Sequence, residues 1–338
     1  MRDLRIGSVC TGYGGLDDAV RAVFGGELAW VADNDPGAAR ILAHRHPGVP
    51  NLGDLTAVDW HDVEPVDIYI GGYPCQPFSL AGDLKGTADE RHLWPYIAHS
   101  LRVLRPRVAI FENVANHLRH GFDTVLCDLA DIGLDVQWDV VRADEVGAPH
   151  QRKRLIVLAA AANASHLGHE RGRSARGGRP GPADSDLAAA HTHFLVPGHD
   201  GELPAGRNAL QRGVRDDAPR CGTATADANG RGRGPHEHDV QQGQPDAAWG
   251  RFAPAIARWE AVTGHRAPWA TDDRGRLSPA FVEWMMGLAP GHVTAVPGLR
   301  RTQQLKALGN GVVPLQAAVA LRLLSARAQC ATEGRAAA

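Results

Sequence analysis

The sequence predicts an α/β fold, because short apolar runs of strand length alternate with helical stretches as far as residue 162. Several of these runs end in turns that hold glycine, proline or a carboxylate. In open α/β sheets, ligands bind at the carboxyl ends of the strands. The expected strands are residues 5–9, 28–32, 67–70, 108–111, 136–141 and 155–162. The expected helices run up to about residue 24 and over residues 37–44, 88–104, 123–132, 252–262, 277–288 and 315–326.

Composition limits the class of protein. The chain has 338 residues, of which 43% are hydrophobic, enough for a sizeable core in one large or two modest domains. The formal net charge of −2 means that any basic surface must be local. The five cysteines form no CxxC pair, which favours a reduced compartment and argues against disulfides or a zinc site. We expect no metal.

The first residues lack the apolar core of a signal peptide, and no segment reads as long and apolar enough to span a bilayer. We therefore expect a monomeric cytoplasmic protein. The composition changes near residue 163, where Gly, Arg, His, Asp and Pro replace the apolar runs. We expect four parts: a catalytic and cofactor-binding domain (1–162), a variable, partly flexible recognition region (163–270), returning helices (271–326) and a frayed tail (327–338).

The first predicted strand runs directly into a glycine turn, Cys10-Thr-Gly12-Tyr-Gly14-Gly15, and then into a helix. This layout lets the backbone approach a cofactor closely and turns a helix N-terminus toward it. A tight turn without a ligand, or the turn of a nicotinamide enzyme, has the same layout. The turn alone therefore leaves the cofactor open.

Carboxylates at the tips of the next strands extend this predicted site. Asp33 ends the second strand and suits the two hydroxyls of a ribose. Asp35 precedes Pro36, which is typical of a helix N-cap, so we assign Asp33 to the ligand and Asp35 to the cap. Asp54 stands before the next apolar run and is a candidate acceptor for an adenine amino group.

The next loop, Gly71-Gly72-Tyr73-Pro74-Cys75-Gln76-Pro77-Phe78-Ser79, holds a cysteine between two prolines. The prolines fix φ and restrict the loop, so the sulfur is positioned before a substrate arrives. The loop follows a strand and belongs to the same sheet edge. A buried structural cysteine in a proline-rich turn is the simpler alternative, but the neighbouring motifs favour a nucleophile.

Two further segments carry charge at strand ends. Glu112 follows the predicted strand 108–111, where a capped turn is the alternative. Arg152 and Arg154 stand at the start of the last strand, where alternation predicts that they share one face. Two guanidiniums on one face suit a carbonyl oxygen or phosphates, and a solvated strand start is the alternative.

In this order the motifs resemble the cytosine-5 DNA methyltransferases, over residues 5–160 and 250–326. The matching segments are Gly12-Tyr-Gly14-Gly15, Asp33, Gly53-Asp54, Pro74-Cys75-Gln76, Asp89-Glu-Arg91-His-Leu93, Glu112-Asn113-Val114, Arg152-Lys-Arg154 and Gly309-Asn310-Gly311. The resemblance implies a doubly wound, Rossmann-like mixed sheet of the class I methyltransferase type, with a small, loop-rich second lobe. It also implies S-adenosylmethionine as cofactor and double-stranded DNA as partner.

The resemblance assigns roles to single residues. The implied catalytic residues are Cys75, Glu112, Arg152 and Arg154, and Pro74, Gln76 and Ser79 belong to the substrate loop. The implied cofactor residues are Cys10, Gly12, Gly14, Gly15, Asp33, Asp54, Leu93 and Asn310. Cys10 stands where the family usually has Phe, Asp33 where Glu is commoner, and His150 where Gln is usual.

The implied reaction is methyl transfer to carbon 5 of a flipped-out cytosine, with Cys75 bonded covalently to carbon 6. Glu112 would need a raised pKa to protonate or polarise ring nitrogen 3. Two alternatives share these motifs: a tRNA-directed methyltransferase and a DNA-binding regulator or decoy with little turnover. The sequence does not identify the target bases or a cognate restriction endonuclease.

Overall fold

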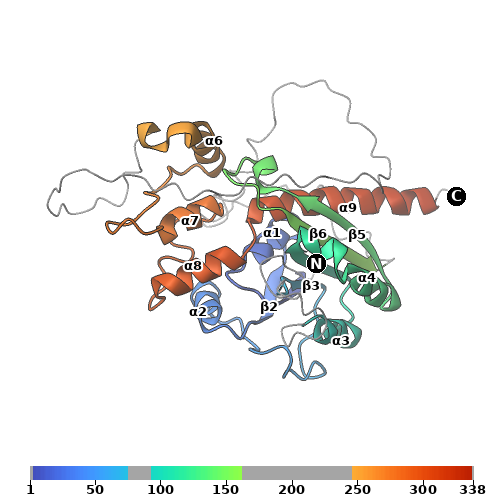
Figure 1. Ribbon diagram of the computed structural model, residues 1–338. Helices are drawn as coiled ribbons and strands as arrows, with labels where there is room; N and C mark the ends of the chain where they lie inside the picture. The colour runs from blue at the N-terminus through green and yellow to red at the C-terminus, as the bar shows by residue number, and fades with distance from the viewer. Residues whose placement is uncertain (1–2, 75–92, 162–245, 337–338) are drawn as a thin grey trace, which may run out of the picture.

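The computed structural model describes residues 3–74, 93–161 and 246–336, with the side chains of these ranges except 246–248 and 331–336 (Figure 1). Within these residues a six-stranded sheet has the order β2-β1-β3-β4-β6-β5. The first four strands pair in parallel, and β6 runs antiparallel to both β4 and β5. The strands are β1 (Arg5–Val9), β2 (Glu27–Ala32), β3 (Ile68–Gly71), β4 (Val108–Val114), β5 (Leu134–Val141) and β6 (Arg154–Ala161).

Helices cover both faces of this sheet, which explains why β3 is apolar throughout rather than alternating. One hydrophobic cluster joins α3 and α4 to one face, and a second joins α1, α2 and α9 to the other. The α-helices are α1 (Gly15–Phe24), α2 (Pro36–Arg45), α3 (Trp94–Leu104), α4 (Phe122–Asp131), α6 (Ala253–Thr263), α7 (Pro279–Met285), α8 (Arg301–Asn310) and α9 (Pro314–Ala336). The shorter 3-10 helices are η2 (Ala115–Arg119), η3 (Ala143–Val146) and η5 (Asp246–Phe252). The predicted doubly wound mixed sheet is confirmed.

A third hydrophobic cluster lies beside the sheet and joins η5, α6, α7 and α8, which gather on one side in Figure 1. Its largest members are Trp249, Trp259 and Trp284, and Tyr13 reaches it from the glycine turn. Most of the predicted recognition region lies outside the described residues, so the four predicted domain boundaries stay predictions.

Several element boundaries differ from the prediction. Helix α3 begins at Trp94, with Pro95 in its first turn, and residues 88–92 lie outside the described residues. Strand β4 continues through Val114, because β6 supplies pairing partners as far as Arg154. Helix α8 was not predicted as a separate helix. Helix α9 reaches Ala336, so the expected helix end near residue 326 is wrong, whereas the frayed tail stays a prediction like the other domain boundaries.

One helical stretch, Arg301–Cys330, is long and apolar enough to cross a membrane by length and composition alone, which the sequence analysis did not expect. The stretch is divided between α8 and α9, and half of its most apolar window is buried. Helix α9 contributes Ala317, Leu321 and Leu324 to the cluster on the sheet. It therefore packs as a core helix.

Candidate functional site

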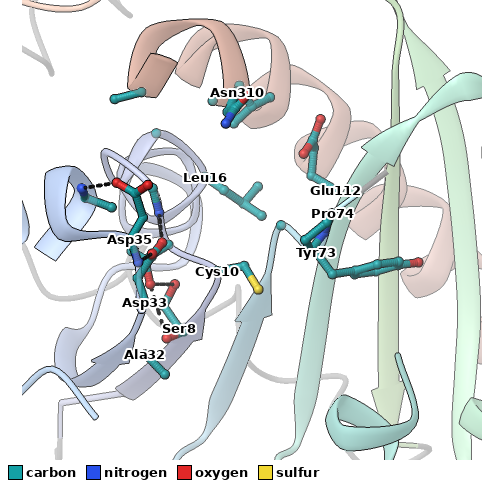
Figure 2. Close-up of a pocket in the computed structure, with 18 of the residues that line it drawn as sticks. Ser8, Cys10, Leu16, Ala32, Asp33, Asp35, Tyr73, Pro74, Glu112 and Asn310 are labelled. Atoms are coloured by element: carbon teal, nitrogen blue, oxygen red, sulfur yellow. Dashed lines mark hydrogen bonds between the residues drawn. The ribbon is translucent and has the colours of Figure 1, made fainter. Parts of the chain in front are cut away.

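A cavity of about 670 Å³ opens where β1, β2, β3 and β4 end (Figure 2). Segments far apart in the sequence line it, from the glycine turn to the end of α8. The predicted site residues that line it are Cys10, Gly12, Gly15, Asp33, Asp54, Pro74, Leu93, Glu112, Arg154 and Asn310. The predicted residues Cys75, Gln76 and Ser79 lie outside the described residues.

The glycine turn forms the wall of the cavity beside α1. Gly12 and Gly14 have φ values of 61° and 84°, in the left-handed region that favours glycine. Gly14 is the N-cap of α1, so it supports the turn without lining the cavity itself. At Gly15 a side chain would collide with the carbonyl oxygen of Val312, which requires glycine there. The first backbone N–H groups of α1 therefore lie beside the cavity, where they suit an anionic ligand group.

The two acidic tips differ in their surroundings. The Asp33 carboxylate accepts hydrogen bonds from the N–H of Gly12 at 2.8 Å and of Asp35 at 2.9 Å. Burial nevertheless raises the pKa of Asp33 above its ordinary value. Asp54 is exposed and accepts bonds from the backbone and hydroxyl of Thr56, which hold its pKa below the usual range.

The predicted N-cap is confirmed: Asp35 accepts hydrogen bonds from the N–H groups of Gly37 and Ala38. Its second oxygen lies 2.5 Å from Nζ of Lys306 on α8. The capping residue thus also joins α2 to α8 across one side of the cavity.

Cys10 lies between the acidic side of the cavity and Glu112 (Figure 2). Its φ of 51° is unusual for a residue other than glycine, and its N–H donates to the carbonyl of Ala32 at 2.8 Å. Desolvation, followed by the charges of Asp33 and Asp54, raises the pKa of its thiol far above the ordinary value. Cys10 therefore contributes an uncharged thiol to the wall of the cavity.

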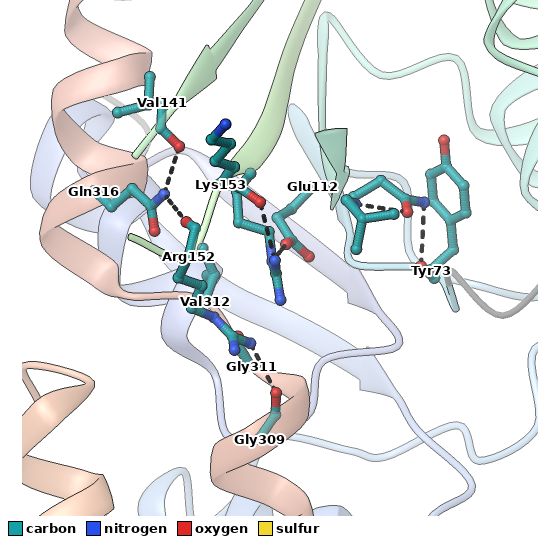
Figure 3. Close-up of polar contacts among 12 residues, drawn as sticks. Tyr73, Glu112, Val141, Arg152, Lys153, Gly309, Gly311, Val312 and Gln316 are labelled. Atoms are coloured by element: carbon teal, nitrogen blue, oxygen red, sulfur yellow. Dashed lines mark hydrogen bonds and ion pairs between the residues drawn. The ribbon is translucent and has the colours of Figure 1, made fainter. Parts of the chain in front are cut away.

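A buried ion pair occupies the other end. Nε of Arg154 lies 2.5 Å from Oε1 of Glu112, and the two side chains are only 15% and 11% exposed. Nη1 of Arg154 also donates to the carbonyl of Lys153 at 3.0 Å (Figure 3). Burial raises the pKa of Glu112, and the positive charges of Arg154 and Arg152 oppose this shift without cancelling it. A carboxyl group with a raised pKa therefore lies beside a fixed guanidinium.

The described part of the cysteine loop lies at this same end. Asn113, next to Glu112 on β4, donates from Nδ2 to the carbonyl of Tyr73 at 3.3 Å. Pro74 lines the cavity together with Glu112 and Arg154. The described chain after β3 therefore ends at Pro74, on the wall of the cavity that carries the ion pair.

Arg152 differs from the prediction. Strand β6 begins only at Arg154, and Arg152 precedes it with a φ of 26°, so strand alternation does not set its direction. Its Nη2 donates to the carbonyls of Gly309, at 2.8 Å, and of Gly311. Arg152 is absent from the cavity wall, while Arg154 forms part of it. Arg152 and Arg154 therefore do not share one face of a strand.

Comparison with known proteins identifies the family. The profile of the C-5 cytosine-specific DNA methylases matches residues 4–176, which is just over half of the chain. This chain belongs to that family. The match includes the glycine turn, the acidic tips, the cysteine loop, Glu112 and both arginines.

Curated relatives of this methylase domain include Type II methyltransferases of Neisseria. The chain is 33% identical over 158 residues to the Type II methyltransferase M.NlaX of Neisseria lactamica, covering 45% of this chain and 49% of that protein. It is 31% identical over 141 residues to M.NgoBV of Neisseria gonorrhoeae, covering 38% of this chain and 33% of that protein. The chain thus matches about half or less of the length of these relatives.

Among solved structures, the Dnmt2 methyltransferase of S. pombe superimposes with a TM-score of 0.57 at 15% identity. The alignment covers 95% of this chain and 98% of that one. At this identity the likeness concerns the fold, which is that of the class I methyltransferases.

The sequence analysis missed two charged residues of the cavity, Asp17 and Lys306. Asp17 on α1 is 1% exposed and lines the cavity, so its carboxyl group is buried. Lys306 comes from α8, which was not predicted, so no pattern pointed to it. Asp17 lies two residues after Gly15 of the glycine turn, and an acidic residue at the third helical position was the available signal. Within the described ranges no cluster of His, Cys, Asp and Glu is arranged to hold a metal ion.

Proposed function

We propose that this chain transfers a methyl group from S-adenosylmethionine to carbon 5 of cytosine in double-stranded DNA. The observation that carries the proposal is the buried Glu112–Arg154 pair, which shares one cavity with the glycine turn and the acidic strand tips. One hollow thus offers groups for a pyrimidine ring at one end and for a nucleoside at the other. Family membership supports the same activity.

The residues present fit the cofactor. Asp33 is suited to the ribose hydroxyls and Asp54 to the adenine amino group, because carboxylates accept hydrogen bonds from both. The N-terminus of α1 is suited to the methionine carboxylate, and Leu93 and Asn310 would flank the methionine end. When bound, S-adenosylmethionine supplies a methyl group activated by a positively charged sulfur.

The protein's own residues would activate the cytosine. The thiolate of Cys75 would add to carbon 6, which makes carbon 5 nucleophilic toward the methyl group. Glu112 would bond the exocyclic amine and donate a proton at ring nitrogen 3, for which its raised pKa is suited. Arg154 would hold the carbonyl oxygen at carbon 2. Loss of the carbon-5 proton then returns the electron pair that expels the Cys75 thiolate.

This chemistry requires a base outside the helix, because stacking covers carbon 6 in duplex DNA. Residues 163–270 are the part of the chain that we propose to contact the DNA target, and residues 80–87 belong to the loop that follows Cys75. Neither identifies the recognised bases. The curated relatives are named as Type II methyltransferases, and a cognate restriction endonuclease is a possible partner of this chain.

The test is methyl transfer from labelled S-adenosylmethionine to unmethylated genomic DNA, followed by bisulfite sequencing. We expect label in DNA, at carbon 5 of cytosine in a fixed sequence context. Glu112→Gln should lose this label. Asp139→Asn is the matched control, because Asp139 pairs with Arg327 at 2.9 Å outside the cavity.

Two alternatives give different results in the same experiment. A tRNA-directed enzyme would label tRNA and leave DNA blank. A DNA-binding decoy would retain DNA in a binding assay and label neither nucleic acid. Either result contradicts the proposed function.

A further inference from the structure

The end of α8 and its short connection to α9, residues 309–313, are held from two directions. On one side Arg152 donates to the carbonyls of Gly309 and Gly311 (Figure 3). On another side the hydroxyl of Tyr13 donates to the carbonyl of Val312 at 2.5 Å. Asn310 lies between these anchored positions and lines the cavity. The position of Asn310 therefore depends on contacts made by its neighbours.

Arg152 satisfies carbonyl groups that a helix end leaves without partners. Helix α8 ends at Asn310, so the Gly309 carbonyl belongs to the last turn, where no further helical N–H follows. The same carbonyls carry the negative end of the helix dipole, which a guanidinium neutralises. A forked donor serves two oxygens at once, which an ammonium does less well.

The backbone of Arg152 is fixed from the opposite side. Gln316, which is fully buried on α9, donates from Nε2 to the carbonyls of Arg152 and Val141, both at 2.7 Å. The φ of 26° at Arg152 is costly for a residue other than glycine and persists only where surrounding contacts enforce it. Helix α9 thus holds the backbone of Arg152 while its side chain holds the end of α8.

The Tyr13 contact ties the same connection to the glycine turn. The Tyr13 ring is 1% exposed and packs so closely on Gly311 that any side chain at Gly311 would overlap it. Nε2 of His292 lies 2.8 Å from the carbonyl of Tyr13 and donates to it. The two walls of the cavity, the glycine turn and the end of α8, are therefore joined through Tyr13.

We infer that Arg152 is a positioning residue for cofactor binding, which holds Asn310 and the end of α8 against the glycine turn, and that it does not contact the cytosine. The inference rests on the proposed function, because it takes the cavity to be the cofactor site. It differs from the role that sequence alone assigns to Arg152, which is contact with a carbonyl oxygen or phosphates.

Calorimetric titration with S-adenosylhomocysteine, without DNA, separates the two roles. For Arg152→Met we expect the dissociation constant to rise on the order of tenfold, as for the loss of one charge-assisted contact. Arg152→Lys keeps the charge but not the fork, and should lie between Met and the wild type. Tyr13→Phe removes the second anchor and should also weaken binding. Arg102→Met, which removes a contact to Asp128 outside the cavity, should change nothing.

Steady-state kinetics completes the test. If Arg152 positions the cofactor site, saturating cofactor restores most of the turnover of Arg152→Lys, and the KM for DNA stays unchanged. Unchanged cofactor affinity in Arg152→Met, Arg152→Lys and Tyr13→Phe, with turnover lost at saturating cofactor, would overturn the inference. A wild-type protein that binds no S-adenosylhomocysteine would refute the proposed function and this inference together. Unchanged affinity in the variants would refute the inference alone.

Discussion

The hydroxyl of Tyr73 lies 2.7 Å from Nε2 of His117, and both side chains are buried. Nδ1 of His117 lies 2.8 Å from the carbonyl of His120, which can only accept, so Nδ1 carries the proton. Nε2 is then an acceptor, and the Tyr73 hydroxyl donates to it. This bond fixes the chain two residues before Cys75, with the Tyr73 ring packed against Trp94 and Phe111.

Removing this hydroxyl should affect both stability and turnover. Tyr73→Phe keeps the ring but removes a buried hydrogen bond to Nε2 of His117, which costs about 1 kcal/mol of unfolding free energy. We also expect a lower kcat, because Tyr73 fixes the approach to Cys75. Urea denaturation and a methyl-transfer assay measure the two effects.

Tyr69→Phe is the matched control for this prediction. The Tyr69 hydroxyl lies 2.8 Å from Oγ of Ser100 in the same core, and Tyr69 lies outside the cavity wall. It should lose similar stability without a loss of kcat. Equal kcat values in the two variants would show that the Tyr73 bond serves folding alone.

Glu112 should be needed as an acid. Glu112→Gln keeps the shape and loses the proton that passes to ring nitrogen 3, so kcat should fall about 100-fold or more. In the wild type, kcat should fall as pH rises through the raised pKa of Glu112, because the ionised form cannot donate. A pH–rate profile measures this. A profile identical in shape for the wild type and Glu112→Gln would contradict the assignment.

Asp17 predicts a pH dependence of stability. Burial raises the pKa of Asp17 from 3.8 to about 7, so the folded protein holds this proton more tightly than the unfolded chain. The stability due to this group is present at low pH and is lost as pH rises from about 4 to about 7. Asp17→Asn lacks this loss. Its unfolding free energy, relative to that of the wild type, should therefore rise by on the order of 2 kcal/mol between pH 5 and pH 7. Urea denaturation at several pH values tests it, and a constant difference would be incompatible with a buried acid.

The cysteines should differ in reactivity. Cys127 and Cys330 are exposed free thiols, whereas desolvation disfavours the thiolate of Cys10. Iodoacetamide at pH 8 should therefore modify Cys127 and Cys330 while leaving Cys10 unmodified. Peptide mass mapping over time measures the order, and early labelling of Cys10 would mean that its thiol is not desolvated.

Sequence patterns predicted the strands and most of the site because each predicted group stands at a strand end. Parallel strands place their carboxyl ends at one edge, so Asp33, Pro74 and Glu112 meet although they are far apart in sequence. The Asp35 cap followed from Pro36, since both signals act within one helical turn.

Tertiary contacts decided what the patterns missed. The direction of Arg152 depends on the ends of α8 and α9, more than 150 residues away, and no local periodicity encodes it. The bond between Tyr73 and His117 likewise joins the segment after β3 to η2 through the core. Helix α8 has few apolar residues on a single face, so helical periodicity gave no sign of it.

The most direct test of the central claim is adduct formation with duplex DNA that carries 5-fluorocytosine at the target site, because fluorine at carbon 5 cannot leave as a proton does. With S-adenosylmethionine present, intact-mass analysis should show the protein bonded to the DNA through Cys75, and Cys75→Ser should show no adduct. A folded, cofactor-binding wild-type protein that forms no such adduct would contradict the account.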